Sequence, residues 1–447
     1  GKPMTPPRKI VVLVAMSLTA MLHPLHASAA IEGRLSAQQR EAALQAIKTE
    51  FDQGYVFPEM RPKIISRLDS RQRAGDYDTD DPVQFADRIT SDLREVSDDR
   101  HLSLRVDATA YSAAKAEPGD DAGEDAYYRG LAERSNHGLS ELKVLPGNIR
   151  YLRITGFQWI DDETGAVYDA AMRFLHGGDA VVIDLRNNGG GSHGAVRYLV
   201  SHFLDPDTLE LSFLEGSKPP SQSRTLDYLP AGRLKGKPLY VLINGQTASA
   251  AEAFAYDVQQ FHLGELIGAK TVGAANNNKL VPIAPGFILS VSYGRPLHAV
   301  SGGNWEGKGV APDVEVPPEQ ALEVAQAKAL QDLLQGGNIS PEQRRDYAWA
   351  QAGVAAKLQP AELDKEMFPR LAGRYAKPGT SAAAIDVASR DDVLWLTLSK
   401  RPAARLTPLS KELFAVEGYE SLRVRLRGDS LELIWRDEAA PRVYRRE

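Results

Sequence analysis

The segment "PLYVLINGQTASAAEAFAY", Pro238 to Tyr256, joins an apolar run directly to a stretch that favours a helix. Its first half is typical of a buried β-strand, and the alanines that follow Ser249 have high helix propensity. A serine at such a junction serves as a helix N-cap or as a nucleophile, and the local pattern gives the two roles equal weight. The first N–H groups of the helix, on Ala250 and Ala251, would point toward the loop, where they suit a developing oxyanion.

Alternating strand and helix signals continue on both sides of this segment. The expected strands are "NIRYLRIT" (148–155), "AVVIDLR" (180–186), "PLYVLIN" (238–244) and "FILSVSY" (287–293). The expected helices are "GAVYDAAMRFLH" (165–176), "HGAVRYLVSHFL" (193–204) and "AAEAFAYDVQQF" (250–261). Near-continuous apolar strands that alternate with helices predict a largely buried sheet, and therefore an α/β domain over residues 141–317.

The regions that flank this domain differ in pattern. Residues 30–106 carry helical periodicity, with serine and Asp-Pro signals at the helix starts, and predict a small helical domain. Residues 107–140 are rich in Ala, Gly, Asp and Glu and are interpreted as a loop or linker. Residues 318–360 predict a helical connector, and the alternating strands of residues 361–447 predict a small antiparallel barrel or sandwich.

The N-terminal 29 residues are typical of a tag remnant followed by a secretory signal peptide. Arg8 and Lys9 precede the apolar run Ile10 to Leu22, and an A-x-A site follows at residues 27–29. The apolar run is short for a membrane span, which needs about 20 residues, although an uncleaved anchor is the alternative. We therefore expect an exported bacterial protein, periplasmic or secreted, that is free of the membrane after cleavage.

Composition excludes several classes of function. The net charge of -6 gives no electrostatic footprint for nucleic acid, and the absence of cysteine excludes a thiol nucleophile, a thiolate metal site and any disulfide. No histidine and acid pattern has the spacing of a zinc site, so neither a metal nor another cofactor is expected.

Three further features carry residues suited to acyl-transfer chemistry. The run Gly189 to Gly191 follows the expected strand "AVVIDLR", where glycine lets the backbone approach a substrate or simply forms a tight turn. His101, in "SDDRHLSLRV", and His193, just after the glycines, are both candidate bases, and the pattern alone does not choose between them. Glu306 follows Trp305 in a glycine-rich loop, where it is either the acid that orients a histidine or a solvated loop residue.

Taken in order, "DDRHL", "LPGNIRYLRITGF", "VVIDLRNNGGG", "TASAAEAFA" and "NWEGKGVAPDVEV" resemble the S41 serine peptidase family. This family includes tail-specific proteases, the tricorn core protease and the interphotoreceptor retinoid-binding proteins. The resemblance covers about residues 36–316 and implies a ClpP/crotonase-like α/β core. About forty residues between His101 and "LPGNIRYL" leave no room for the PDZ domain of tail-specific members. The C-terminal strands resemble small lipocalin-like barrels.

The resemblance also separates two catalytic schemes. Tail-specific members use a Ser/Lys dyad, but Ala274 occupies the position of that lysine here, and Lys270 and Lys279 are out of register. Tricorn-like members pair the serine with a histidine and a glutamate, which correspond here to His101 and Glu306. The resemblance thus favours His101 over His193 as the base.

By the same correspondence, Ser249 is the nucleophile, and the backbone N–H groups of Gly190 and Ala250 form the oxyanion hole. Glu252 and Gly189 take supporting roles. The expected function is a serine-type peptidase that hydrolyses peptides or unfolded proteins through an acyl-enzyme. The alternatives are an esterase with the same triad and a non-catalytic carrier of apolar ligands, because the family also includes retinoid carriers. Homo-oligomer formation is compatible with the sequence but not specified by it.

Overall fold

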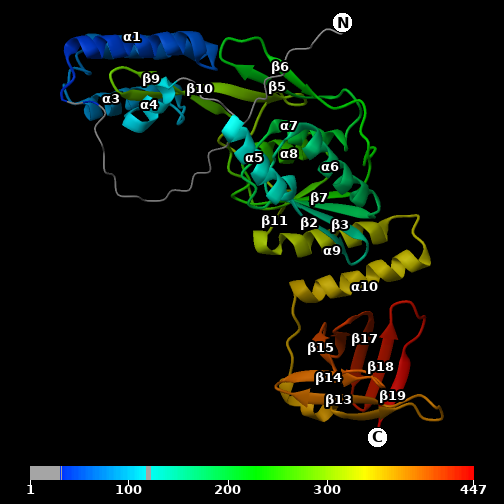
Figure 1. The fold of residues 1–447 in the computed structure, drawn as a ribbon. Coiled ribbons are helices and arrows are strands. Elements are labelled where there is room, and N and C mark those ends of the chain that lie inside the picture. The colour runs from blue at the N-terminus through cyan, green and yellow to red at the C-terminus, as the bar shows by residue number, and fades with distance from the viewer. Residues whose placement is uncertain (1–30, 32, 117–121) are drawn as a thin grey trace.

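The computed structural model describes residue 31 and residues 33–116 and 122–447 (Figure 1). The signal peptide predicted for residues 1–29 lies outside the described residues. The fold is mixed α/β with an antiparallel barrel at the C-terminus, which confirms the predicted fold class. No helix among the described residues is long and apolar enough to cross a membrane.

A six-stranded sheet forms the centre of the molecule, in the order β11-β8-β7-β4-β3-β2. All neighbours are parallel except β2, which pairs antiparallel with β3 at one edge. The strands are β2 (Leu139–Leu145), β3 (Ile149–Ile154), β4 (Ala180–Asp184), β7 (Leu239–Ile243), β8 (Glu265–Gly268) and β11 (Val314–Glu315). Every residue of β4 and β7 is buried, as expected for central strands that are covered on both faces.

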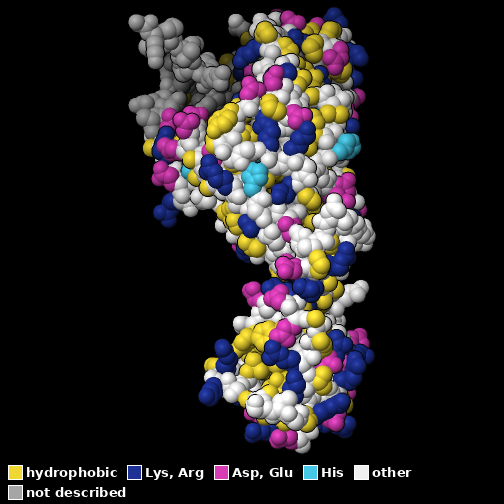
Figure 2. Space-filling view, turned by 90° about the vertical axis from the view of Figure 1, so that its right-hand side faces the viewer, with side chains coloured by type: hydrophobic (Ala, Val, Ile, Leu, Met, Phe, Trp, Pro, Cys, Tyr) yellow, Lys and Arg dark blue, Asp and Glu magenta, His cyan; other side chains and the backbone are white. Residues whose placement is uncertain are grey.

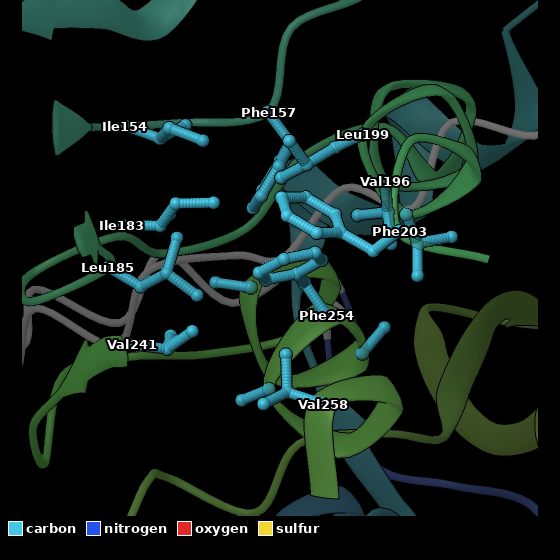
Figure 3. Packing of buried hydrophobic residues seen from close by; sticks show 14 of the residues in the cluster. Ile154, Phe157, Ile183, Leu185, Val196, Leu199, Phe203, Val241, Phe254 and Val258 are labelled. Atoms are coloured by element: carbon cyan, nitrogen blue, oxygen red, sulfur yellow. The ribbon is translucent and has the colours of Figure 1, made fainter. Parts of the chain in front are cut away.

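Helices cover both faces of this sheet. One face carries α6 (Asp161–His176), α7 (His193–Ser201) and α8 (Ala250–Gln260), and Figure 3 shows the apolar side chains that fill the space between them and the strands. The opposite face carries α9 (Ala321–Gln335) and α10 (Pro341–Leu358), which share a second core with the sheet. The segment predicted as a helical connector therefore completes the central domain, because its apolar face covers strands that would otherwise face water.

A second, antiparallel sheet lies between the central domain and the N-terminal helices. It contains β1 (Ser103–Val106), β5 (Leu209–Glu215), β6 (Ser221–Arg224), β9 (Asn277–Ile283) and β10 (Phe287–His298). The predicted strand "FILSVSY" belongs to this sheet rather than to the parallel one. Helices α1 (Ala37–Gly54), α2 (Arg61–Arg73) and α3 (Pro82–Ser97), with the short turn η1 (Pro58–Met60), pack on β1, β9 and β10, so the N-terminal helices share a core with strands that are distant in sequence.

The stretch predicted as a loop or linker, residues 107–140, contains helices, so that interpretation was wrong. It forms α4 (Ala108–Lys115), α5 (Ala122–Arg134), η2 (Asn136–Gly138) and the start of β2. The Asp107 side chain caps α4 by accepting from the Ala110 N–H, and alanine and glutamate favour helix even where apolar periodicity is weak.

The C-terminal residues form a closed eight-stranded antiparallel barrel, which appears as the lowest lobe in Figure 1 and Figure 2. Its strands are β12 (Gly373–Ala376), β13 (Ile385–Arg390), β14 (Val393–Thr397), β15 (Ala404–Pro408), β16 (Leu413–Val416), β17 (Tyr419–Arg427), β18 (Ser430–Trp435) and β19 (Arg442–Arg446). The short η3 (Pro318–Gln320) leads into α9, while η4 (Lys365–Met367) and α11 (Phe368–Leu371) lead into the barrel. Arg423 of β17 stacks 3.9 Å from the Trp349 ring centroid and donates to the Trp349 carbonyl at 2.7 Å, which ties the barrel to α10.

Candidate active site

Ser249 lies at the sharp turn between the end of β7 and the start of α8. Its backbone has φ 55° and ψ -119°, a conformation that costs a non-glycine residue about 1–3 kcal/mol and that points to a functional constraint. The residue is 6% exposed, and its N–H donates to Glu252 Oε1 at 3.0 Å. Ala250 is the first residue of α8, so its N–H has no partner inside the helix. The turn therefore places a hydroxyl beside an unpaired helix N–H group.

The glycine run after β4 lies directly against this turn. Gly190 has φ 106°, and a Cβ added to it would lie 2.8 Å from Ser249 Cβ and 3.0 Å from the Ala250 nitrogen. The Gly190 N–H donates to Asn188 Oδ1 at 2.9 Å, and its carbonyl accepts from the Phe157 N–H at 2.8 Å. Glycine is required at position 190 because a side chain would collide with the start of α8.

Asn188, a residue that the sequence interpretation missed, fixes the glycine run from inside the core. Its side chain is fully buried and donates to the Ile154 carbonyl at 2.9 Å, while its backbone carbonyl accepts from the Ala248 N–H at 3.0 Å. It therefore connects the end of β3, the glycine run and the residue before Ser249. An asparagine two positions before a glycine is a turn signal, but nothing in the pattern says that it is buried.

His101 and Glu306 meet although they are 205 residues apart in the chain. His101 Nε2 contacts Glu306 Oε1, while Glu306 Oε2 accepts from the N–H groups of Ala275 at 2.7 Å and Asn276 at 2.8 Å. The hydrogen bond with Glu306 raises the pKa of His101, outweighing the opposite effect of burial. Burial alone would raise the pKa of Glu306, but the bonds from His101 and the two N–H groups together lower it.

Asp99 holds the turn that carries His101, and it too was missed. Its Oδ1 accepts from the His101 N–H at 3.0 Å. Its Oδ2 accepts from the Tyr55 hydroxyl at 2.9 Å and from the Ser292 hydroxyl at 2.7 Å. The carboxylate thus ties the histidine backbone to the end of α1 and to β10. The motif "DDRHL" contained this signal, because an acid two residues before a histidine can form such a turn.

Glu252 is fully buried and satisfies several donors at once. Besides the Ser249 N–H, it accepts from Thr271 Oγ1 at 2.6 Å, from the Gly273 N–H at 2.7 Å and from the Ala274 N–H at 2.9 Å. Burial raises its pKa, and these hydrogen bonds offset only part of that effect. Glu252 therefore joins the turn of Ser249 to the loop that holds Glu306.

The structure does not bring every candidate to one point. Among the described residues, no hydrogen bond joins the Ser249 hydroxyl to the His101 ring. Glu252 holds the Ser249 backbone, while Asp99 and Glu306 hold His101. His193 is buried, and its Nε2 pairs with Glu210 at 3.0 Å and lies 3.3 Å from the Ser223 hydroxyl, so this nitrogen is engaged inside the core. Within the described part of the chain, no group of three or more His, Asp or Glu side chains could hold a metal ion.

Comparison with known families covers the same part of the chain. Residues 148–316 match the model of peptidase family S41. This segment is an S41 peptidase domain. It includes Ser249, the glycine run, Glu252 and Glu306, whereas His101 precedes it.

The relatives and solved structures that resemble this chain carry related names. A probable CtpA-like serine protease of Staphylococcus epidermidis is 26% identical over 181 residues, which are 40% of this chain and 36% of that protein. A homologue in Staphylococcus aureus gives the same figures. The chain thus matches about a third of the length of these relatives.

The photosystem II D1 C-terminal processing protease has a TM-score of 0.45 and 17% identity, over 64% of this chain and 94% of that one. Mature CPAF has a TM-score of 0.41 and 13% identity, over 68% of this chain and all of that one.

Proposed function

We propose that this protein is a serine peptidase in which Ser249 is the nucleophile, His101 the general base and Glu306 the acid that orients the base. The observation that carries the proposal is the contact between His101 Nε2 and Glu306 Oε1, made by residues from different parts of the fold. A carboxylate in this position fixes the ring of a catalytic histidine and stabilises the imidazolium that forms during reaction. The S41 domain and the strained turn at Ser249 support the same reaction class.

The proposed reaction proceeds through an acyl-enzyme. His101 removes the proton of Ser249 Oγ as that oxygen forms a bond to the carbonyl carbon of a peptide. The tetrahedral intermediate collapses, the C–N bond breaks, and the protonated His101 gives its proton to the leaving amine. Water then attacks the ester, His101 takes its proton, and the acid product leaves as Ser249 regains a proton. In this sequence His101 must close on Ser249 Oγ when the substrate is bound.

The oxyanion of the intermediate is stabilised by backbone N–H groups at the start of α8 and in the glycine run. Ala250 supplies an N–H that is unpaired within its helix, with the positive end of the helix dipole behind it. The Gly190 N–H lies beside it but donates to Asn188 Oδ1. We propose that the oxyanion competes with Asn188 for this donor, since an ionised acceptor forms the stronger hydrogen bond. Gly189 supports the turn.

The substrates proposed for this site are peptides or unfolded proteins. Export from a bacterial cell is part of the same proposal. It depends on the motif between Arg8 and Ala29, which lies outside the described residues.

Casein digestion and labelling with a fluorophosphonate probe test the proposal. The wild-type protein should cleave casein and carry the label on Ser249, whereas Ser249→Ala and His101→Ala should lose nearly all cleavage. Ser301→Ala removes a hydroxyl from an exposed neighbouring loop and serves as the matched control, with activity retained. Equal cleavage by wild type and Ser249→Ala would reject the assignment.

A further inference from the structure

The antiparallel edge of the central sheet is exposed along β2. This strand pairs with β3 on one side, and no strand in the described part of the chain pairs with its other side. Its middle residues face solvent, with Leu142 38% exposed and Val144 59% exposed. Figure 1 shows β2 next to β3 at the margin of the α/β domain. An uncovered edge strand with exposed aliphatic side chains is a template for pairing with another strand.

Between Glu141 and Val144, the side chains of β2 separate by face into an apolar pair and a charged pair. Leu142 lies opposite Leu152, whose side chain belongs to the core beneath α6, so Leu142 and Val144 extend that apolar face to the edge of the sheet. Glu141 and Lys143 lie on the other face, where the Lys143 ammonium is 3.7 Å from the Glu141 carboxylate and 5.9 Å from the Tyr151 ring centroid. Over these four residues, one face of β2 therefore offers apolar contacts to a neighbouring strand, and the other face offers charged contacts.

We propose that β2 pairs antiparallel with β2 of a second copy of this chain, with the two-fold axis at Leu142. A two-fold axis perpendicular to a sheet pairs residues on the same face, so it must lie midway between the two copies of one residue. An axis at Glu141 would place two carboxylates opposite each other, and an axis at Lys143 would place two ammonium groups opposite each other. With the axis at Leu142, Glu141 of each copy faces Lys143 of the other, and the two Leu142 side chains meet.

This charge pattern also explains how the edge avoids other strands. A lysine on an edge strand disfavours pairing with an arbitrary β-segment, because the ammonium group would lose its hydration without a partner. In the symmetric pair, each Lys143 faces Glu141 of the other copy. Lys143 therefore disfavours pairing with other strands but permits pairing with a second β2. The contact is isologous, as in most homodimers, and it would join two six-stranded sheets into one. A single strand pair buries less than a standard interface of about 800 Å² per partner, so we expect dimerisation to depend on protein concentration.

Single cysteines test the register directly, because the chain contains no cysteine of its own. In the proposed dimer, two Leu142→Cys residues face each other with Cα atoms about 4.5–5.5 Å apart, within the range of about 4.4–6.8 Å that a disulfide spans. Val144 lies two residues from the axis, so two Val144→Cys residues are separated by four residues along the strands, or about 14 Å. We expect Leu142→Cys to form a disulfide-linked dimer on mild oxidation and Val144→Cys, the matched control, to remain monomeric on a non-reducing gel.

Charge reversal tests the pairing independently of cysteine chemistry. Lys143→Glu should weaken dimerisation at least about tenfold, because two attractive pairs become repulsive, and Glu141→Lys combined with Lys143→Glu should restore it. Lys411→Glu makes the same charge change on an exposed lysine of the barrel and should leave the dimer intact. Molar mass from light scattering after gel filtration is the readout, and circular dichroism verifies folding.

Three results would overturn the proposal. They are a wild-type protein that is monomeric at every concentration tested, equal cross-linking of the two cysteine variants, and a folded double charge swap that stays monomeric. None depends on peptidase activity.

Discussion

Replacing Gly190 with alanine tests the most restrictive contact of the site. The new Cβ would lie 2.8 Å from Ser249 Cβ, 2.9 Å from the Ala248 carbonyl oxygen and 3.0 Å from the Ala250 nitrogen. All three atoms belong to the turn of the nucleophile, so that turn or the glycine run must move by about 0.5–1 Å. A displacement of about 1 Å at a reacting centre lowers the rate about 10²-fold, and loss of one oxyanion donor costs about 10²–10³. We therefore expect kcat to fall about 10²–10³-fold.

The same substitution has a separate cost in stability. Alanine at φ 106° is strained by about 1–2 kcal/mol, and overpacking adds about 1–3 kcal/mol. Gly302→Ala is the control, because Gly302 has φ 71° with no atom within 4 Å of its added Cβ, so it carries the strain without the collision. Turnover of a fluorogenic peptide and urea unfolding separate the two effects. A Gly190→Ala protein with unchanged kcat and reduced stability would refute the position of the oxyanion hole.

Three further predictions concern the base and its surroundings. Glu306 raises the pKa of His101, and only the neutral ring accepts a proton, so kcat/KM should rise with pH through that raised pKa. Glu306→Gln should move the acidic limb of a pH profile of peptide cleavage to lower pH. Asp99→Ala should lower kcat about tenfold and the free energy of unfolding by about 1–3 kcal/mol, with partial recovery in Asp99→Asn, measured by steady-state kinetics and urea titration. His193→Ala removes the 3.0 Å contact between the His193 ring and the buried Glu210 carboxylate, so unfolding should become about 1–3 kcal/mol easier while the kcat of the folded fraction, measured after active-site titration, stays unchanged.

The sequence predicted the elements of the central domain because their signals are local. The junction after β7 combined an apolar strand with an alanine-rich helix, and both form where the pattern placed them. The alternating C-terminal strands predicted an antiparallel β-domain, which the barrel confirms. The helix α4 was missed because its apolar periodicity is weak and its start depends on one capping side chain, that of Asp107.

Pairings between distant segments were less accessible to sequence reasoning. The strand "FILSVSY" has the composition of a parallel-sheet strand, but β10 instead pairs antiparallel with β1, β5 and β9. A strand's composition reports burial and not its neighbour, so the second sheet could not be derived. The residues that fix the site, Asn188 and Asp99, were missed for the same reason. Their roles depend on polar groups that only the folded chain brings near, such as the Ile154 backbone carbonyl and the Ser292 hydroxyl.

The loop of residues 273–276 links Glu252 to Glu306. Its four consecutive N–H groups are shared by two carboxylates, since Glu252 accepts the first two and Glu306 accepts the last two. Glu252 also holds the backbone of Ser249, so Ser249 and Glu306 belong to one hydrogen-bonded unit. His101 lies instead in the turn before β1, beside Leu102, which belongs to the core that the N-terminal helices share with the second sheet. Ala250, next to Ser249, and Leu102, next to His101, belong to different hydrophobic cores, so in the proposed mechanism substrate binding has to bring the hydroxyl and the imidazole together.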